Sequence, residues 1–176
     1  SGTVFDNEQF DSRIEIAHAQ IGPFNGVIGA QYGYRDLAAV GEEAFIPKTN
    51  TETTAVFILE DVDITDDLHF EIGGRYEHQE SVPDNAATVS NDMYSISTGI
   101  HYHFNEKNAL SVNIARSQRA PAAEELFANG PHVATGTFEL GQSDMDIETS
   151  NSFDISIAQE TGILQWNLSL FLNYIE

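Results

Sequence analysis

The 176-residue sequence contains no cysteine and only seven lysines and arginines, against 28 aspartates and glutamates. Without cysteine, neither disulfide bonds nor thiolate metal sites can form. The formal net charge of −21 excludes nucleic acid as a partner, because phosphate backbones are bound by basic patches. An acidic surface attracts cations or keeps a protein soluble, and the charge alone does not separate these two roles. A helix spanning a membrane needs about 18 consecutive apolar residues, and the sequence has no such run.

Common catalytic motifs are missing as well. The sequence has no Gly-x-Ser-x-Gly elbow, no His-Glu-x-x-His zinc helix and no glycine-rich phosphate loop. The segments "HVATG" and "GQSDMD" carry histidine, serine and aspartate, but neither pairs a nucleophile with a base. We therefore expect that the protein is not an enzyme.

The sequence does contain repeated alternation of apolar and polar residues with a period of two, which predicts β-strands with two different faces. In the clearest case, every second residue from Leu164 to Tyr174 is apolar, and Phe171 is the exception on the polar side. Eight such segments are predicted, over residues 9–20, 26–37, 52–62, 68–80, 92–104, 109–118, 149–160 and 163–175.

The links between these segments alternate in length. Short links follow the first, third, fifth and seventh segments, and the long links cover residues 38–51, 81–91 and 119–148. A meander with tight turns at one end and long loops at the other is typical of a transmembrane β-barrel, although a soluble up-and-down barrel has the same order. The predicted fold is all-β, an antiparallel up-and-down meander of eight strands.

Aromatic residues favour the membrane barrel over the soluble one. Trp166 and Tyr174 lie eight residues apart on the apolar face, which is about 20 Å along the membrane normal for a strand tilted by about 40°. Membrane strands carry aromatic girdles near both interfaces. We therefore predict that the apolar face is convex and contacts lipid, with Leu168 and Leu170 on it, and that Asn167 and Ser169 lie on the concave side.

The longest link has a composition of its own. The stretch "ARSQRAPAAEELFANGPHVATGTFELG", followed by "IETSNSFDISI", resembles the late barrel region of TonB-dependent outer-membrane receptors. The segments "GEEAFIPKTNTETTAVFILED" and "LHFEIGGRYEHQE" also resemble barrel strands of that family, and "NGPHVATGTFE" resembles its zinc-uptake, ZnuD-type branch. The residues that carry the family pattern are Arg119, Pro121, Glu125, Leu126, Asn129, Gly130, Glu148, Ser150 and Asn151.

The resemblance implies a wide barrel of about 22 strands with an N-terminal plug in its lumen. Residues 1–176 would then be one partial barrel domain, a slice without the plug and the remaining strands, whose first and last strands do not pair. The whole protein would lie in the cell outer membrane of a Gram-negative bacterium, in contact with lipid. Energy from the TonB complex, delivered through the absent plug, would drive siderophore-receptor-like import of a scarce nutrient.

The resemblance makes zinc, or another metal ion or metal chelate, the first expectation for the cargo, and it implies no resident cofactor. The alternative is a complete small barrel of eight strands in the outer membrane, with a structural or adhesion role, because eight strands suffice to close a barrel.

His132 is the main candidate for contact with a metal. It follows Asn129-Gly130-Pro131, which predicts a turn that holds the next side chain in a defined direction. Neutral imidazole is a good Zn²⁺ ligand, although a single histidine in a polar loop is as readily a solvated residue. The nearest candidate carboxylates in the sequence are Glu124, Glu125 and Glu139, and Glu125 has a second interpretation as a structural anchor paired with Arg119.

A second candidate pair is His101 and His103. Residues at i and i+2 of a strand point to the same face, so both histidines face the predicted lumen near the tight-turn end, where they either chelate a metal or meet the plug or water. Glu42 and Glu43 are loop carboxylates that either attract cations or are simply solvated.

Overall fold

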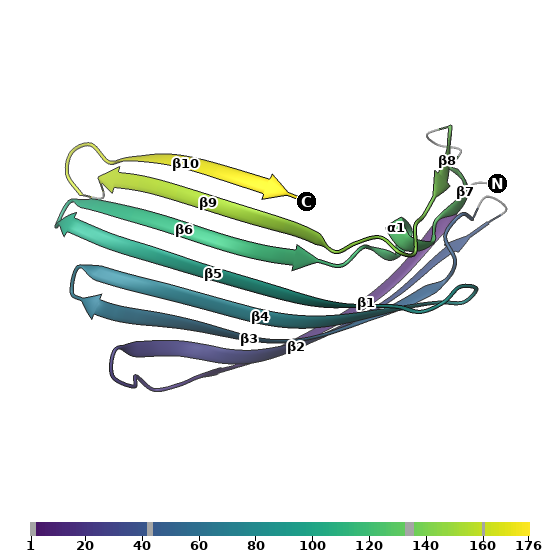
Figure 1. The fold of residues 1–176 in the computed structure, drawn as a ribbon, viewed down its shortest axis with the longest axis horizontal. Coiled ribbons are helices and arrows are strands. Elements are labelled where there is room, and N and C mark those ends of the chain that lie inside the picture. The colour runs from purple at the N-terminus through teal and green to yellow at the C-terminus, as the bar shows by residue number, and fades with distance from the viewer. Residues whose placement is uncertain (1–2, 42–43, 133–135, 160) are drawn as a thin grey trace.

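The computed structural model describes residues 3–41, 44–132, 136–159 and 161–176, and most of these residues lie in β-strands. Eight long strands form one antiparallel sheet in which each strand pairs with the next along the chain (Figure 1). This confirms the predicted meander. The strands are β1 (Val4–Ala17), β2 (Phe24–Val40), β3 (Thr49–Thr65), β4 (Leu68–Pro83), β5 (Val89–Asn105), β6 (Asn108–Arg119), β9 (Glu148–Gln159) and β10 (Trp166–Ile175).

Several strands continue further toward the long loops than predicted. β3 begins at Thr49 and pairs there with Leu37 of β2 and Pro83 of β4. The apolar–polar alternation is absent in "TNTET", where every residue is polar, whereas backbone pairing does not depend on side-chain polarity. β1 is displaced from its predicted range and ends at Ala17, because His18 begins the connection to β2.

The strand register aligns the apolar residues of neighbouring strands into one continuous face. A typical row runs from Leu168 through Ile157 and Leu110 to Tyr102 and Leu68. Large side chains on this face are exposed: the exposed fractions of Leu168 and Leu170 are 59% and 66%. The predicted facing is confirmed in that these leucines do not pack in a central core.

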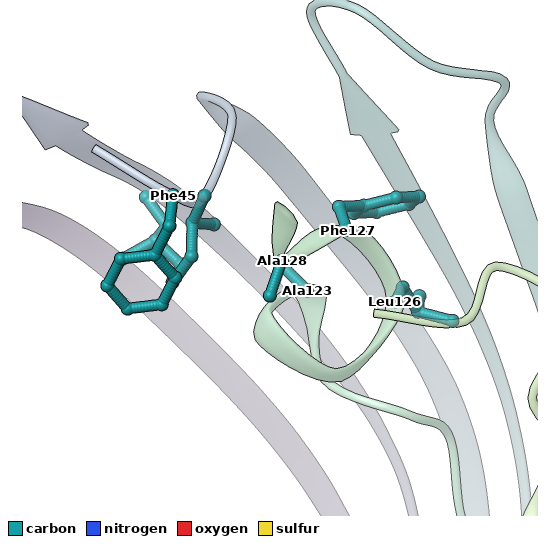
Figure 2. Close-up of a cluster of buried hydrophobic side chains, with 7 residues drawn as sticks. Phe45, Ala123, Leu126, Phe127 and Ala128 are labelled. Atoms are coloured by element: carbon teal, nitrogen blue, oxygen red, sulfur yellow. The ribbon is translucent and has the colours of Figure 1, made fainter. Parts of the chain in front are cut away.

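The main cluster of buried hydrophobic residues lies on the polar side of the sheet, at the end with the long loops. Helix α1 (Ala123–Phe127) and the link after β2 pack there against Leu37, and Figure 2 shows the side chains of this cluster. The helix begins after Ala122, whose backbone N–H donates to a Glu125 carboxylate oxygen at 2.7 Å. The buried cluster comprises Leu37, Phe45, Ile46, Ala123, Leu126, Phe127 and Ala128.

The polar face is the concave one. The link that leaves β6 contacts β4 through a hydrogen bond from Gln79 to the Pro121 carbonyl, and reaches β2 through an ion pair between Glu124 and Arg35. These strands lie up to four positions away from β6 in the sheet. The sheet is curved in Figure 1. This link can reach from β6 to β2 only if it crosses the concave side of the sheet.

No helix or strand was predicted in the longest link, and the structure has both there. This link contains α1 and a small hairpin of β7 (Asn129–His132) and β8 (Thr137–Leu140), which forms a separate two-stranded sheet. Both elements lie at the long-loop end of the molecule (Figure 1).

The large sheet is open. In the part of the chain that the structure describes, β1 pairs only with β2 and β10 only with β9. This is the arrangement predicted for a slice of a wide barrel, and it argues against a complete barrel of eight strands. Among the described residues, no helix is both long and apolar enough to cross a membrane.

Candidate functional site at the loop end of the sheet

His132 is held in place by two neighbouring segments, β8 and the link after β2. The β7–β8 hairpin places its Nδ1 atom 2.5 Å from Oε1 of Glu139. Its ring stacks on Phe45, with the ring centroids 5.0 Å apart and the planes inclined by 26°. The backbone N–H of Asn129 donates to the Phe45 carbonyl at 2.6 Å and fixes β7 to the link after β2. His132 is therefore an oriented side chain and not a freely solvated one.

Gly130 has a different role from the one predicted. The turn expected at Asn129-Gly130-Pro131 is instead the start of β7, and Gly130 does not have a positive φ. A Cβ atom at Gly130 would lie 2.9 Å from Cβ of Phe45. Glycine is needed here because it lets the β7 backbone approach Phe45 closely, which brings the His132 ring onto the phenyl ring.

Of the three predicted carboxylates, the structure brings only Glu139 to His132. Glu124 pairs with Arg35 of β2, with Oε1 2.7 Å from Nη2. Glu125 pairs with Arg119, with Oε2 3.1 Å from Nη1, so the predicted pairing of these two residues is confirmed. A metal role for Glu124 or Glu125 stays a prediction, and both carboxylates are already partly neutralised by guanidinium groups.

Arg119 connects three segments of the sequence motif. Its guanidinium contacts Glu125 in α1 and also Glu148 at the start of β9, with Nη2 3.2 Å from Oε2 of Glu148. The guanidinium is the main reason that the pKa of the Glu125 carboxyl lies below its usual value, the Ala122 N–H adds to this, and partial burial opposes it. The motif thus ties the helix to the ends of two paired strands.

A polar cavity of about 330 Å³ lies between the concave face and the first residues of the long link. Arg35, Arg75 and Arg119 line it, together with glutamine and acidic side chains. Arg75 is paired with Glu77 and donates from Nη1 to Gln31 at 3.2 Å. The cavity therefore presents many hydrogen-bond donors next to compensating carboxylates.

A second cavity, of about 560 Å³, is bordered by aromatic and apolar loop residues. Phe45, Phe127 and Leu140 line it, and its polar lining residues are Lys48, Asn85, Asn129 and Ser143. Phe45 connects this cavity to His132. Sequence reasoning missed Phe45 and Arg35, because neither belongs to the motif and their partners are 87 and 89 residues away.

His101 and His103 lie on the concave face at the short-turn end, far along the strands from His132. Their Nε2 atoms are 3.3 Å apart. Within the described residues, no three side chains of histidine, aspartate or glutamate are grouped to hold one metal ion. Glu42 and Glu43 lie outside the described residues.

Comparisons with known proteins agree with this architecture. The sequence model of the TonB dependent receptor-like β-barrel family matches residues 2–176. The fold is similar to that of the Serratia marcescens hemophore receptor HasR, solved as a double mutant in complex with its hemophore HasA and heme, with a TM-score of 0.77 and 15% identity. It is also similar to the ferric-catecholate import receptor Fiu from Escherichia coli K12, with a TM-score of 0.73 and 16% identity.

Each superposition covers 98% of this chain, and 33% of the HasR chain and 32% of the Fiu chain. The chain therefore spans about a third of the length of these receptors. At such low identity the likeness is one of fold, and neither structure bears on the predicted zinc-uptake branch.

Proposed function

The chain belongs to the TonB-dependent receptor-like β-barrel family, and from this premise we propose that it forms part of the barrel wall of an outer-membrane receptor that imports a scarce nutrient. Members of this family are transporters and not enzymes. The proposed location is the outer membrane of a Gram-negative bacterium, with the apolar face of the sheet against lipid.

The exposed apolar face is the observation that supports this proposal most strongly. Leucine, isoleucine and aromatic side chains cover the convex side of neighbouring strands, and the concave side carries charged and hydroxyl side chains. A large continuous apolar surface marks contact with a membrane or another protein. The same alternation, with polar residues toward the lumen, is characteristic of outer-membrane barrels.

The remaining wall of the barrel would come from strands outside this chain. β1 and β10 each present one unpaired edge, and a sheet edge is a site for pairing with a further strand. We propose that additional strands of the same protein complete the barrel at these edges. The plug, and through it the TonB complex, would act from segments beyond these residues.

For the cargo, we propose a metal ion or a metal chelate, with zinc as the first candidate and His132 as a contact. Glu139 contacts His132 Nδ1, and a carboxylate at this ring nitrogen is a common partner of histidines that bind a metal through Nε2. The similar receptors are described as a complex with heme and as a ferric-catecholate importer. Both descriptions are compatible with a metal-containing cargo.

Zinc binding by the full-length receptor, measured by calorimetry with and without His132→Ala, tests this assignment. Loss of a direct ligand should weaken Zn²⁺ binding well over tenfold. Mutation of residues that only hydrogen-bond to the ligands typically lowers metal affinity 10–100-fold. His78→Ala is the matched control, because His78 lies on the other face and bonds Asp92. Unchanged affinity in His132→Ala would remove His132 from the site and leave zinc without support, while the receptor assignment would stand.

A further inference from the structure

A second group of histidines lies at the short-turn end of the concave face. His69 lies opposite His101 in the β4–β5 register, and His103 is two residues further along β5. The rings of His101 and His103 have centroids 4.6 Å apart and planes at 79°, and those of His69 and His103 have centroids 6.2 Å apart. Three of the six histidines of the sequence thus gather at the opposite end of the sheet from His132.

The separation between His101 and His103 fits a metal chelate. Their Nε2 atoms are 3.3 Å apart. Two nitrogen ligands at about 2.0–2.1 Å from a tetrahedral Zn²⁺ lie about 3.3–3.4 Å from each other. Because both residues project from one face of one strand, their imidazoles can reach a common ion with little backbone movement.

The neighbouring strand holds His101 in a suitable orientation. Ser111 of β6 lies opposite His101, and its Oγ atom is 2.7 Å from His101 Nδ1. When this hydroxyl accepts the Nδ1–H, the neutral imidazole keeps its lone pair on Nε2, the atom nearest His103. Metal-binding histidines are commonly positioned in this way through their second ring nitrogen.

We propose that His101 and His103 chelate a divalent transition-metal ion, with Ser111 as a positioning residue. Imidazole ligands suit Zn²⁺, Cu²⁺ and Ni²⁺, whereas Ca²⁺ and Mg²⁺ prefer oxygen. Water would occupy the other coordination positions, because no group of three metal-binding side chains exists among the described residues. A cavity of about 190 Å³ adjoins His101 and Ser111 and is also lined by Asp61, His69 and Glu71 among others.

The proposed metal site at His101 and His103 does not depend on the metal contact proposed for His132 or on the identity of the cargo. Its test uses the full-length protein with His132→Gln present throughout, so that the loop does not contribute. Zn²⁺ titration by calorimetry should show at least about tenfold weaker binding in His101→Gln and in His103→Gln, and loss of one equivalent in the double variant. His78→Gln is the matched control and should leave binding unchanged, since His78 bonds Asp92 on the other face.

The positioning role of Ser111 has its own readout. Ser111→Ala should weaken Zn²⁺ binding, and Ser111→Thr, which keeps the hydroxyl, should restore it. With Cu²⁺ as the probe, electron paramagnetic resonance should show coupling to two imidazole nitrogens that disappears in the double histidine variant. Unchanged Zn²⁺ stoichiometry and affinity in that double variant would overturn the proposal.

A measurement that leaves these histidines in place covers the case in which the double variant fails to fold. Zn²⁺ should protect His101 and His103, but not His78, from diethyl pyrocarbonate, as read by mass spectrometry. Equal modification of His101 and His103 with and without Zn²⁺ would also overturn the chelate.

Discussion

At the scale of single residues, the sequence motif of the long link mainly fixes helix α1 to the ends of β6 and β9. Arg119 bonds Glu125 and Glu148, and Glu125 also accepts from the Ala122 N–H. The Arg119–Glu125 pair could be predicted, because both residues belong to a motif and lie six positions apart. The contact between Glu124 and Arg35 could not, because it depends on how the link folds across the concave face.

The Glu125 carboxylate should make the attachment of α1 dependent on pH. Its pKa lies below the ordinary value of 4.5, chiefly because of Arg119. A lowered folded-state pKa contributes stability above the unfolded value, and this contribution is lost as the pH falls through the folded value. Amide exchange of α1 should therefore accelerate below about pH 4.5, after correction for intrinsic rates. In Glu125→Gln this acid-dependent part should vanish, and an identical pH profile in the variant would contradict the assignment.

His132 shows the limit of sequence reasoning at a binding site. The sequence makes His132 a candidate metal contact, because it lies in an unusual polar loop within a segment that resembles the family. Glu139 was one of three candidate carboxylates in the sequence, and its selection over Glu124 and Glu125 requires the β7–β8 register. The stacking on Phe45 could not be predicted, because it requires a contact between two separate links.

At the scale of elements, the longest link folds into a helix and a hairpin that sequence periodicity did not indicate. α1 has five residues and β7 and β8 have four each, too few to establish a period of 3.6 or of two. Their positions depend on packing against Leu37 and Phe45, which come from a different part of the chain. The long strands were predictable because each repeats its alternation many times.

Close backbone packing at Gly141 gives a prediction for this link. A Cβ atom there would lie 2.7 Å from the backbone N atoms of Phe127 and Ala128, whereas at Gly74 it would lie 3.7 Å from an Ile58 methyl group. Gly141→Ala should therefore destabilise the local fold of the link by about 1–3 kcal/mol, and Gly74→Ala should not. Limited proteolysis between residues 120 and 147 measures the difference, and equal cleavage rates in both variants would disprove it.

At the scale of the whole molecule, the chain is an open, curved sheet with one apolar and one polar face. Its topology could be predicted from period-two alternation and from the sorting of long and short links. A transmembrane β-barrel and a soluble up-and-down barrel share that topology. They differ in whether the apolar face of the sheet is exposed or packed inside. The structure exposes Leu168, Leu170 and Leu172 on the side away from α1.

A lipid-facing surface predicts an asymmetric response to charge. Leu170 lies midway between Trp166 and Tyr174, and Ser169 is its neighbour on the other face. In the full-length protein, Leu170→Arg should lower the free energy of unfolding in a bilayer by about 2–4 kcal/mol, because arginine at the midplane loses hydration. Ser169→Arg should cost much less. Denaturant titration of both variants in lipid vesicles measures the difference, and equal costs would count against lipid contact at Leu170.

Contact between the apolar face and lipid is central to the proposed function, and a nitroxide scan along β9 tests it most directly. The chain has no cysteine, so single cysteines introduced from Phe153 to Ala158 label unique positions once any cysteine elsewhere in the full-length protein is replaced. In a bilayer, the ratio of accessibility to oxygen over accessibility to a water-soluble nickel chelate should alternate with a period of two. It should be high at Phe153, Ile155 and Ile157, and low at the residues between them. A ratio without this alternation, or one that is high at the polar positions, would contradict the placement of the sheet in the membrane.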